Sequence, residues 1–176
     1  MLIPNLLLIA GTGTKAGKTT VACRIISEHP ELRITAIKIT PHFHETTPGL
    51  ISLSEHEGYV IYEETDKANT KDTSRMLASG AERVIFAKVW DDKLENVFHE
   101  IMKLIPEWSP VICESPALRN FVEPGAFIIM TSDSVNKQKK LNHLQESNHL
   151  MLRLEELDDM ELVPVRFDAG GWNYTV

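Results

Sequence analysis

Ten residues near the start of the chain have the types and the order of a phosphate-binding loop. Residues 11–20 read Gly-Thr-Gly-Thr-Lys-Ala-Gly-Lys-Thr-Thr and directly follow the apolar run 6–10. Glycines let a backbone wrap closely around an anion, and successive N–H groups at a helix start point their positive dipole ends at phosphates. In such a loop the lysine, here Lys18, reaches the β- and γ-phosphates. The hydroxyl that follows it, here Thr19, ligates Mg²⁺.

The spacing of the glycines departs from the common pattern G-x4-G-K-[ST], because position 12 is Thr and glycines stand at 11 and 13. The prediction therefore depends on the strand expected before the loop and the amphipathic helix expected after it. We expect a nucleoside triphosphate, ATP or GTP, bound together with Mg²⁺. The residues expected to hold the nucleotide are Gly11, Thr12, Gly13, Thr14, Lys15, Ala16, Gly17, Lys18, Thr19 and Thr20.

The base stays open. Asn136-Lys137 follows the last of the core strands expected in the sequence and has the start of the Asn-Lys-x-Asp motif that reads guanine in GTPases. Position 139 is Lys instead of Asp, so the motif is incomplete. Guanine specificity is therefore unsupported.

The rest of the chain alternates expected strands with expected helices. This alternation predicts an α/β fold, a mostly parallel sheet with helices on both faces, here the three-layer arrangement of P-loop NTPases. A length of 176 residues suits one domain, residues 1–176. Strands are expected at 5–10, 33–40, 83–89, 110–114 and 126–131, helices at 17–28, 72–79, 94–105 and 135–149, a hairpin around 58–62, and two further strands at 151–154 and 162–167.

Ligands of parallel sheets bind at the carboxyl ends of the strands, so the residues there are the candidates for chemistry. Lys38 lies inside an expected buried strand, where an ammonium needs a partner such as a phosphate, a carboxylate substrate or Glu114. Glu114 ends another buried strand and is suited to hold Mg²⁺ or to orient an attacking group. Asp72 opens an expected helix, where it is either an N-cap or a ligand. The predicted catalytic residues are Lys18, Lys38 and Glu114, and the predicted Mg²⁺ ligands are Thr19, Asp72 and Glu114.

His42 and His44 form a His-x-His pair just after one of these strands. In a strand both side chains would share a face and could bind a metal. The spacing shows no third ligand, so metal binding by this pair stays open.

The composition excludes several classes of protein. A net charge of −7 argues against a general binder of nucleic acids or anionic membranes. No apolar run approaches the length of a membrane span, and the N-terminal segment lacks the positive region of a signal peptide. We therefore expect a cytoplasmic protein. The two cysteines, Cys23 and Cys113, are expected to be small buried side chains without a disulfide.

The order of these motifs resembles the SIMIBI class of P-loop proteins, in particular the molybdopterin-guanine dinucleotide biosynthesis protein B family. The loop itself is more similar to that of the dethiobiotin synthetases, with which Gly11, Thr12, Thr14, Gly17, Lys18 and Thr19 agree. The second resemblance implies that Lys38 contacts substrate and that Asp72 and Glu114 help to hold Mg²⁺. The stretches that carry the first resemblance, within residues 6–133, are Ala36–His42, Asp72–Arg75, Ser79–Ala81, Glu114 and Thr131–Asp133.

Two functions follow from these resemblances. The first is an accessory protein that binds a nucleotide, hydrolyses it slowly, and works with a protein partner in cofactor biosynthesis. The second is a self-sufficient ligase or kinase that acts on a small carboxylate or carbamate. A degenerate loop that keeps its nucleotide for stability is a third alternative, and a homodimer is an open expectation.

Overall fold

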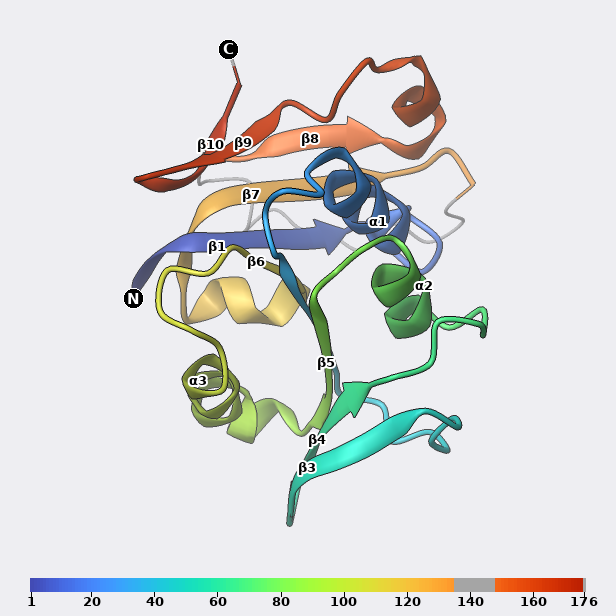
Figure 1. The fold of residues 1–176 in the computed structure, drawn as a ribbon, viewed down its shortest axis with the longest axis vertical. Helices are drawn as coiled ribbons and strands as arrows, with labels where there is room; N and C mark the ends of the chain where they lie inside the picture. Colours follow the sequence, from blue (N-terminus) through green and yellow to red (C-terminus); the bar gives the residue numbers. More distant parts are fainter. Residues whose placement is uncertain (135–147, 176) are drawn as a thin grey trace.

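The computed structural model describes residues 1–134 and 148–175, and its centre is an eight-stranded sheet (Figure 1). The strands are β1 (Leu2–Gly11), β2 (Thr35–Thr40), β3 (Leu50–His56), β4 (Tyr59–Glu64), β5 (Arg83–Val89), β6 (Val111–Glu114), β7 (Glu123–Thr131) and β8 (Leu150–Arg153). Their order in space is β3-β4-β5-β2-β6-β1-β7-β8. The six strands from β5 to β8 in that order run parallel, whereas β4 is antiparallel to both β5 and β3. The expected α/β fold with a mostly parallel sheet is confirmed.

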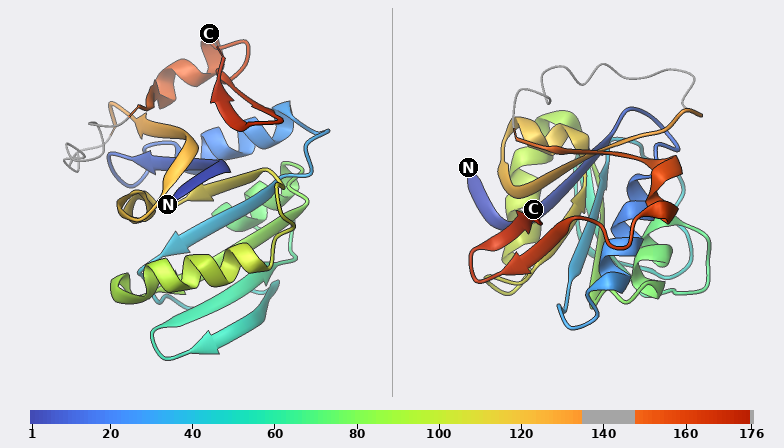
Figure 2. Two further views of the ribbon diagram at one scale, coloured as in Figure 1. Left: turned by 90° about the vertical axis from the view of Figure 1, so that its left-hand side faces the viewer. Right: turned by 90° about the horizontal axis from the view of Figure 1, so that it is seen from above.

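Helices cover both faces of this sheet, as the two turned views of Figure 2 show. They are α1 (Lys18–Glu28), α2 (Asp72–Ala78) and α3 (Leu94–Lys103). Short 3₁₀ turns precede α3 and follow β6 and β8: η1 (Asp91–Lys93), η2 (Pro116–Asn120) and η3 (Leu154–Asp159). Alternate residues of β1 take part in two separate cores, Leu6 and Leu8 in the core with α3, and Leu7 and Ile9 in the core with α1 and α2. All four are fully buried, which explains the unbroken apolar run before the loop. The loop therefore follows the most completely buried kind of strand, a rigid support for a binding site.

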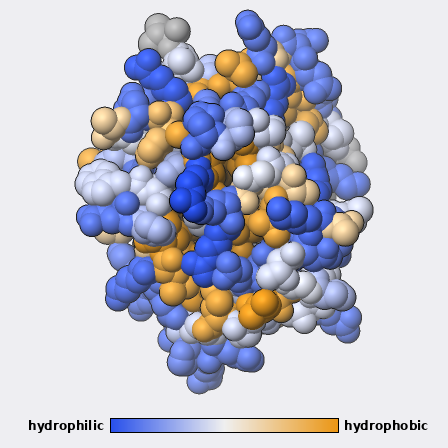
Figure 3. All heavy atoms as spheres, viewed as in Figure 1, coloured by the Kyte–Doolittle hydropathy of each residue, from blue (hydrophilic) through white to orange (hydrophobic). Residues whose placement is uncertain are grey.

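The outer surface is mostly hydrophilic in the view of Figure 3, with apolar residues recessed between the polar ones. Within the described residues, none of the helices is long and apolar enough to cross a membrane. Both cysteines are free, as expected, but only Cys113 is fully buried. Cys23 lies on α1 and is half-buried, because it flanks rather than forms the buried stripe of that helix.

Most of the expected elements are present within a few residues of their predicted ends. The hairpin is longer than expected, since β3 and β4 together run from 50 to 64. The expected strand at 162–167 is wrong in part: β9 (Val165–Asp168) pairs with β10 (Gly171–Tyr174) in a separate two-stranded sheet. Ala169 and Gly170 form the turn between the two strands, and Gly171, with a φ of +108°, begins β10, which runs back along β9. The expected helix 135–149 falls largely outside the described residues, and residues 148–149 are not helical.

Trp172 holds this C-terminal hairpin against the sheet. Its side chain is 1% exposed, its Nε1 donates a hydrogen bond of 3.1 Å to the carbonyl of Val111, and its ring meets the edge of Phe167. We expect Trp172→Phe to lower the free energy of unfolding by about 2 kcal/mol, because it removes this donor and leaves a small void. Urea denaturation measures the change. A denaturation midpoint equal to that of the wild type would show that the hairpin is not tied to the sheet in this way.

Candidate functional site

The loop expected to bind phosphate connects the end of β1 to the start of α1. Two of its glycines are required by the local geometry. A Cβ at Gly11 would lie 2.8 Å from Cγ of Lys18, so only glycine lets the Lys18 side chain pass over the end of the strand. Gly17 stands just before α1 with a φ of +92°, a left-handed conformation in which other residues are strained. Strand, loop and helix thus follow one another in the order that the sequence predicts.

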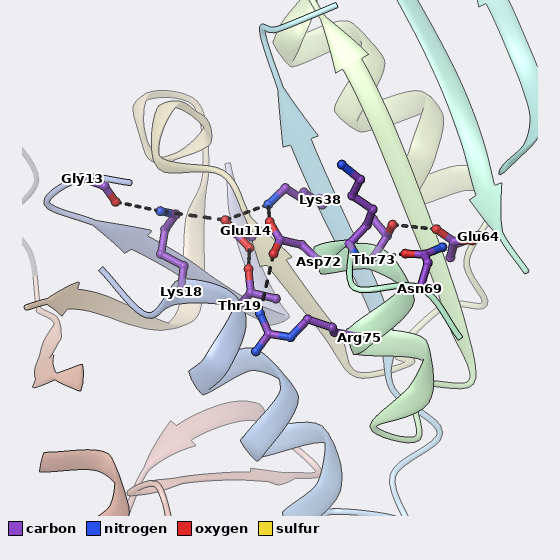
Figure 4. Close-up of polar contacts among 11 residues, drawn as sticks. Gly13, Lys18, Thr19, Lys38, Glu64, Asn69, Asp72, Thr73, Arg75 and Glu114 are labelled. Carbon is purple, nitrogen blue, oxygen red and sulfur yellow. Dashed lines mark hydrogen bonds and ion pairs between the residues drawn. The ribbon is translucent and has the colours of Figure 1, made fainter. Parts of the chain in front are cut away.

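Lys18 and Thr19 both reach toward Glu114, which ends β6 (Figure 4). The Nζ of Lys18 donates to the Gly13 carbonyl at 3.1 Å and lies 3.9 Å from Glu114 Oε1. The hydroxyl of Thr19 donates to Glu114 Oε2 at 2.8 Å. A loop lysine, a helix-start hydroxyl and a strand-end carboxylate therefore share one small region.

The other loop residues divide between the surface of a cavity and the layer beneath it. Thr12 and Ala16 are buried and do not line the cavity, and the N–H of Thr12 donates to the Met130 carbonyl at 3.0 Å, which ties the loop to β7. The loop residues that line the cavity are Gly11, Gly13, Thr14, Lys15, Gly17, Lys18, Thr19 and Thr20.

Lys38, Asp72 and Glu114 form an ion cluster beside the loop, as the strand-end argument predicts. Lys38 and Glu114 are register neighbours on β2 and β6, and Lys38 Nζ donates to Glu114 Oε1 at 3.2 Å. The same ammonium donates to Asp72, the first residue of α2. Arg75, one turn later, lies 3.7 Å from the other carboxylate oxygen of Asp72. Glu114 is only 6% exposed, so its charge depends on these partners.

Lys38 and Asp72 favour each other's charged forms. Burial lowers the pKa of Lys38, but the charges and hydrogen bonds of Glu114 and Asp72 outweigh it and leave that pKa above its ordinary value. Burial raises the pKa of Asp72, but the charge of Lys38, its hydrogen bond to Asp72 and the charge of Arg75 bring that pKa below its ordinary value. At neutral pH the site therefore contains a Lys38 ammonium bonded to an ionised Asp72 carboxylate.

This donor set fits a hard cation. Two carboxylates and the Thr19 hydroxyl are oxygen donors of the kind that Mg²⁺ takes, and Mg²⁺ retains several waters, so few protein ligands suffice. The Lys38 ammonium bridges the two carboxylates as a cation of the protein's own. No group of three or more His, Cys, Asp or Glu suited to a metal occurs in the described part of the chain. The rings of His42 and His44 are stacked with centroids 5.6 Å apart. His42 also lines the cavity.

The cavity over the loop has a volume of about 710 Å³ and extends beyond the expected phosphate site. It continues past the ends of β2 and β5 to the start of α3. The residues after β5 were not among the candidates predicted from the sequence, although the rule on strand ends applies to β5 as well. The wall in that direction, formed in part by buried apolar residues, comprises Ile39, Thr40, Pro41, Val89, Asp91, Leu94, Ser115, Pro116 and Ala117.

The site was also compared with known proteins. No protein-family model, no curated protein and no solved structure matches this chain. The functional interpretation therefore depends on the residues of the site and on the motif resemblance of the sequence.

Proposed function

We propose that the protein is a P-loop NTPase of the SIMIBI kind that binds ATP or GTP with Mg²⁺ and hydrolyses it slowly, as an accessory protein in cofactor biosynthesis. One observation carries this proposal: Lys18, Thr19 and Glu114 meet at the junction of a glycine loop and a helix. Those are the residue types that phosphate binding and Mg²⁺ coordination require at that junction.

Each residue's role in this proposal follows from its position. The N–H groups of the loop and of the first turn of α1 face the phosphates. Lys18 exchanges its bond to the Gly13 carbonyl for phosphate oxygens, since its amine already lies over the loop. Thr19 and Glu114 hold the cation, with Asp72 as a further oxygen donor. Mg²⁺, when bound, neutralises charge on the phosphates.

A second candidate function is supported by the shape of the cavity. Its extension past β2 and β5, with Ile39, Val89 and Leu94 in the wall, leaves room for an acceptor beside Lys38. A small carboxylate or carbamate there would accept the phosphoryl group, and the chain would act as a ligase or kinase without a protein partner. Lys38 would then contact both Glu114 and the acceptor.

Calorimetry and thermal stabilisation with ATP, GTP and CTP, each with and without Mg²⁺, test the proposal. We expect Mg²⁺-dependent binding of one purine nucleotide and slow release of phosphate. Faster release on addition of small carboxylates would favour the second function. Failure of all three nucleotides to bind, with Mg²⁺ present, would contradict the proposal.

A further inference from the structure

Glu64, at the end of β4, is a buried carboxylate that the proposed chemistry does not use. It is 2% exposed, and none of the ion pairs in the described residues includes it. Its Oε1 accepts hydrogen bonds from the N–H groups of Thr65 at 3.1 Å and Asp66 at 2.9 Å. Its Oε2 accepts one from the hydroxyl of Thr73 at 2.7 Å. Three donors thus satisfy both oxygens of a carboxyl group that would be costly to bury without hydrogen bonds.

These donors lie at the two ends of one segment, residues 65–73. Between them the segment is braced by further side chains: Asp66 accepts from the N–H of Ala68 and from the amide of Asn69, both at 2.7 Å. Asn69 in turn accepts from the N–H of Lys71 at 2.8 Å. The segment ends in Asp72 and Thr73, the first two residues of α2, so its fixed geometry determines where α2 begins.

α2 cannot set this position by itself. It has seven residues, and its N-cap residue, Lys71, makes no side-chain capping bond. Helices of this length depend on tertiary contacts for their stability. The bond from Thr73 to Glu64 is such a contact, and it is adjacent in sequence to the carboxylate that meets Lys38 (Figure 4).

We propose that Glu64, through Thr73, is the positioning residue for Asp72, and thereby sets the cation requirement of the nucleotide site. This inference rests on the proposed function for its link to Mg²⁺. Its structural part, that the Thr73–Glu64 bond holds Asp72 against Lys38, does not need a nucleotide.

The test is Thr73→Val, which keeps the shape of the side chain and removes the donor. Partners that orient a metal ligand typically change metal affinity 10–100-fold, so the Mg²⁺ concentration for half-maximal nucleotide binding is expected to rise about 10-fold. Nucleotide affinity at saturating Mg²⁺ is expected to stay the same. Thr73→Ser retains the hydroxyl and is expected to keep the wild-type Mg²⁺ requirement. Ser79→Ala removes a hydroxyl from the other end of α2, where it donates to the Arg75 carbonyl, and serves as the matched control.

A second readout uses the protein without nucleotide. The rate at which Lys38 is acylated is measured by mass spectrometry relative to the exposed Lys103. This relative rate is expected to be higher in Thr73→Val, because Asp72 no longer holds the Lys38 amine in place. Faster acylation in a protein that binds no nucleotide would separate a failed proposed function from a correct positioning role. Wild-type acylation together with a wild-type Mg²⁺ requirement in Thr73→Val, or an equal shift in Ser79→Ala, would overturn the inference.

Discussion

Replacing Lys18 with alanine is expected to weaken binding of the nucleotide about 100-fold while the fold remains intact. Hydrogen bonds to charged groups contribute about 1.5–3 kcal/mol each, so two contacts between the ammonium and phosphate oxygens amount to at least about 3 kcal/mol. Every 1.4 kcal/mol changes affinity about tenfold. Isothermal titration calorimetry at constant Mg²⁺ measures this loss.

The fold does not depend on this lysine in the same way, because its ammonium bonds a loop carbonyl rather than filling the core. The thermal midpoint of Lys18→Ala is therefore expected to stay close to that of the wild type. Lys103→Ala, at the exposed end of α3, is the control for loss of a positive charge. Equal affinities of wild type and Lys18→Ala would remove the loop from the proposed binding site.

Lys38→Met is expected to lower the free energy of unfolding by about 3–5 kcal/mol, because removing one partner of a buried ion pair leaves the other charge uncompensated. Glu114 is the charge in question, 6% exposed and bonded to the ammonium at 3.2 Å. The Lys18 amine, 3.9 Å from the same carboxylate, reduces the loss toward the lower figure. Urea denaturation at neutral pH measures it.

A double-mutant cycle identifies the cause of this loss. Lys38→Met combined with Glu114→Gln removes both charges, so it is expected to regain most of the stability that Lys38→Met loses. Mg²⁺ is expected to stabilise Lys38→Met more than the wild type, because both carboxylates are then free of the internal ammonium. Additive effects of the two substitutions would show that the cluster is not a coupled unit.

The elements around the site were predictable from local patterns. The apolar run of β1 and the glycines of the loop mark a strand followed by a helix, and α2 begins at Asp72 and ends before Gly80, as the pattern indicates. The meeting of Lys38 with Glu114 followed from the rule that parallel strands end at one edge.

What escaped prediction depends on contacts between distant parts of the chain. Nothing near Glu64 in the sequence shows that its carboxylate is buried. Its hydrogen-bond partner Thr73 lies nine residues further along the chain, at the start of α2. The docking of the β9–β10 hairpin on the large sheet likewise depends on Trp172, whose partner Val111 is 61 residues away. Local patterns carry no information about such partners.

β1, the strand that leads into the loop, has neighbours that are synthesised late. Among the described strands, β1 pairs with β6 and β7, and the contact between Thr19 and Glu114 spans 95 residues. Pairings of this kind close large loops and form slowly, after local helices and hairpins. A nascent chain from which Glu114 has not yet emerged from the ribosome therefore has the complete loop but lacks the carboxylate that faces it. If the proposed function is correct, nucleotide binding should accordingly appear only after Glu114 and the following β7, which ties the loop through Thr12, have emerged, and it would report a late stage of folding.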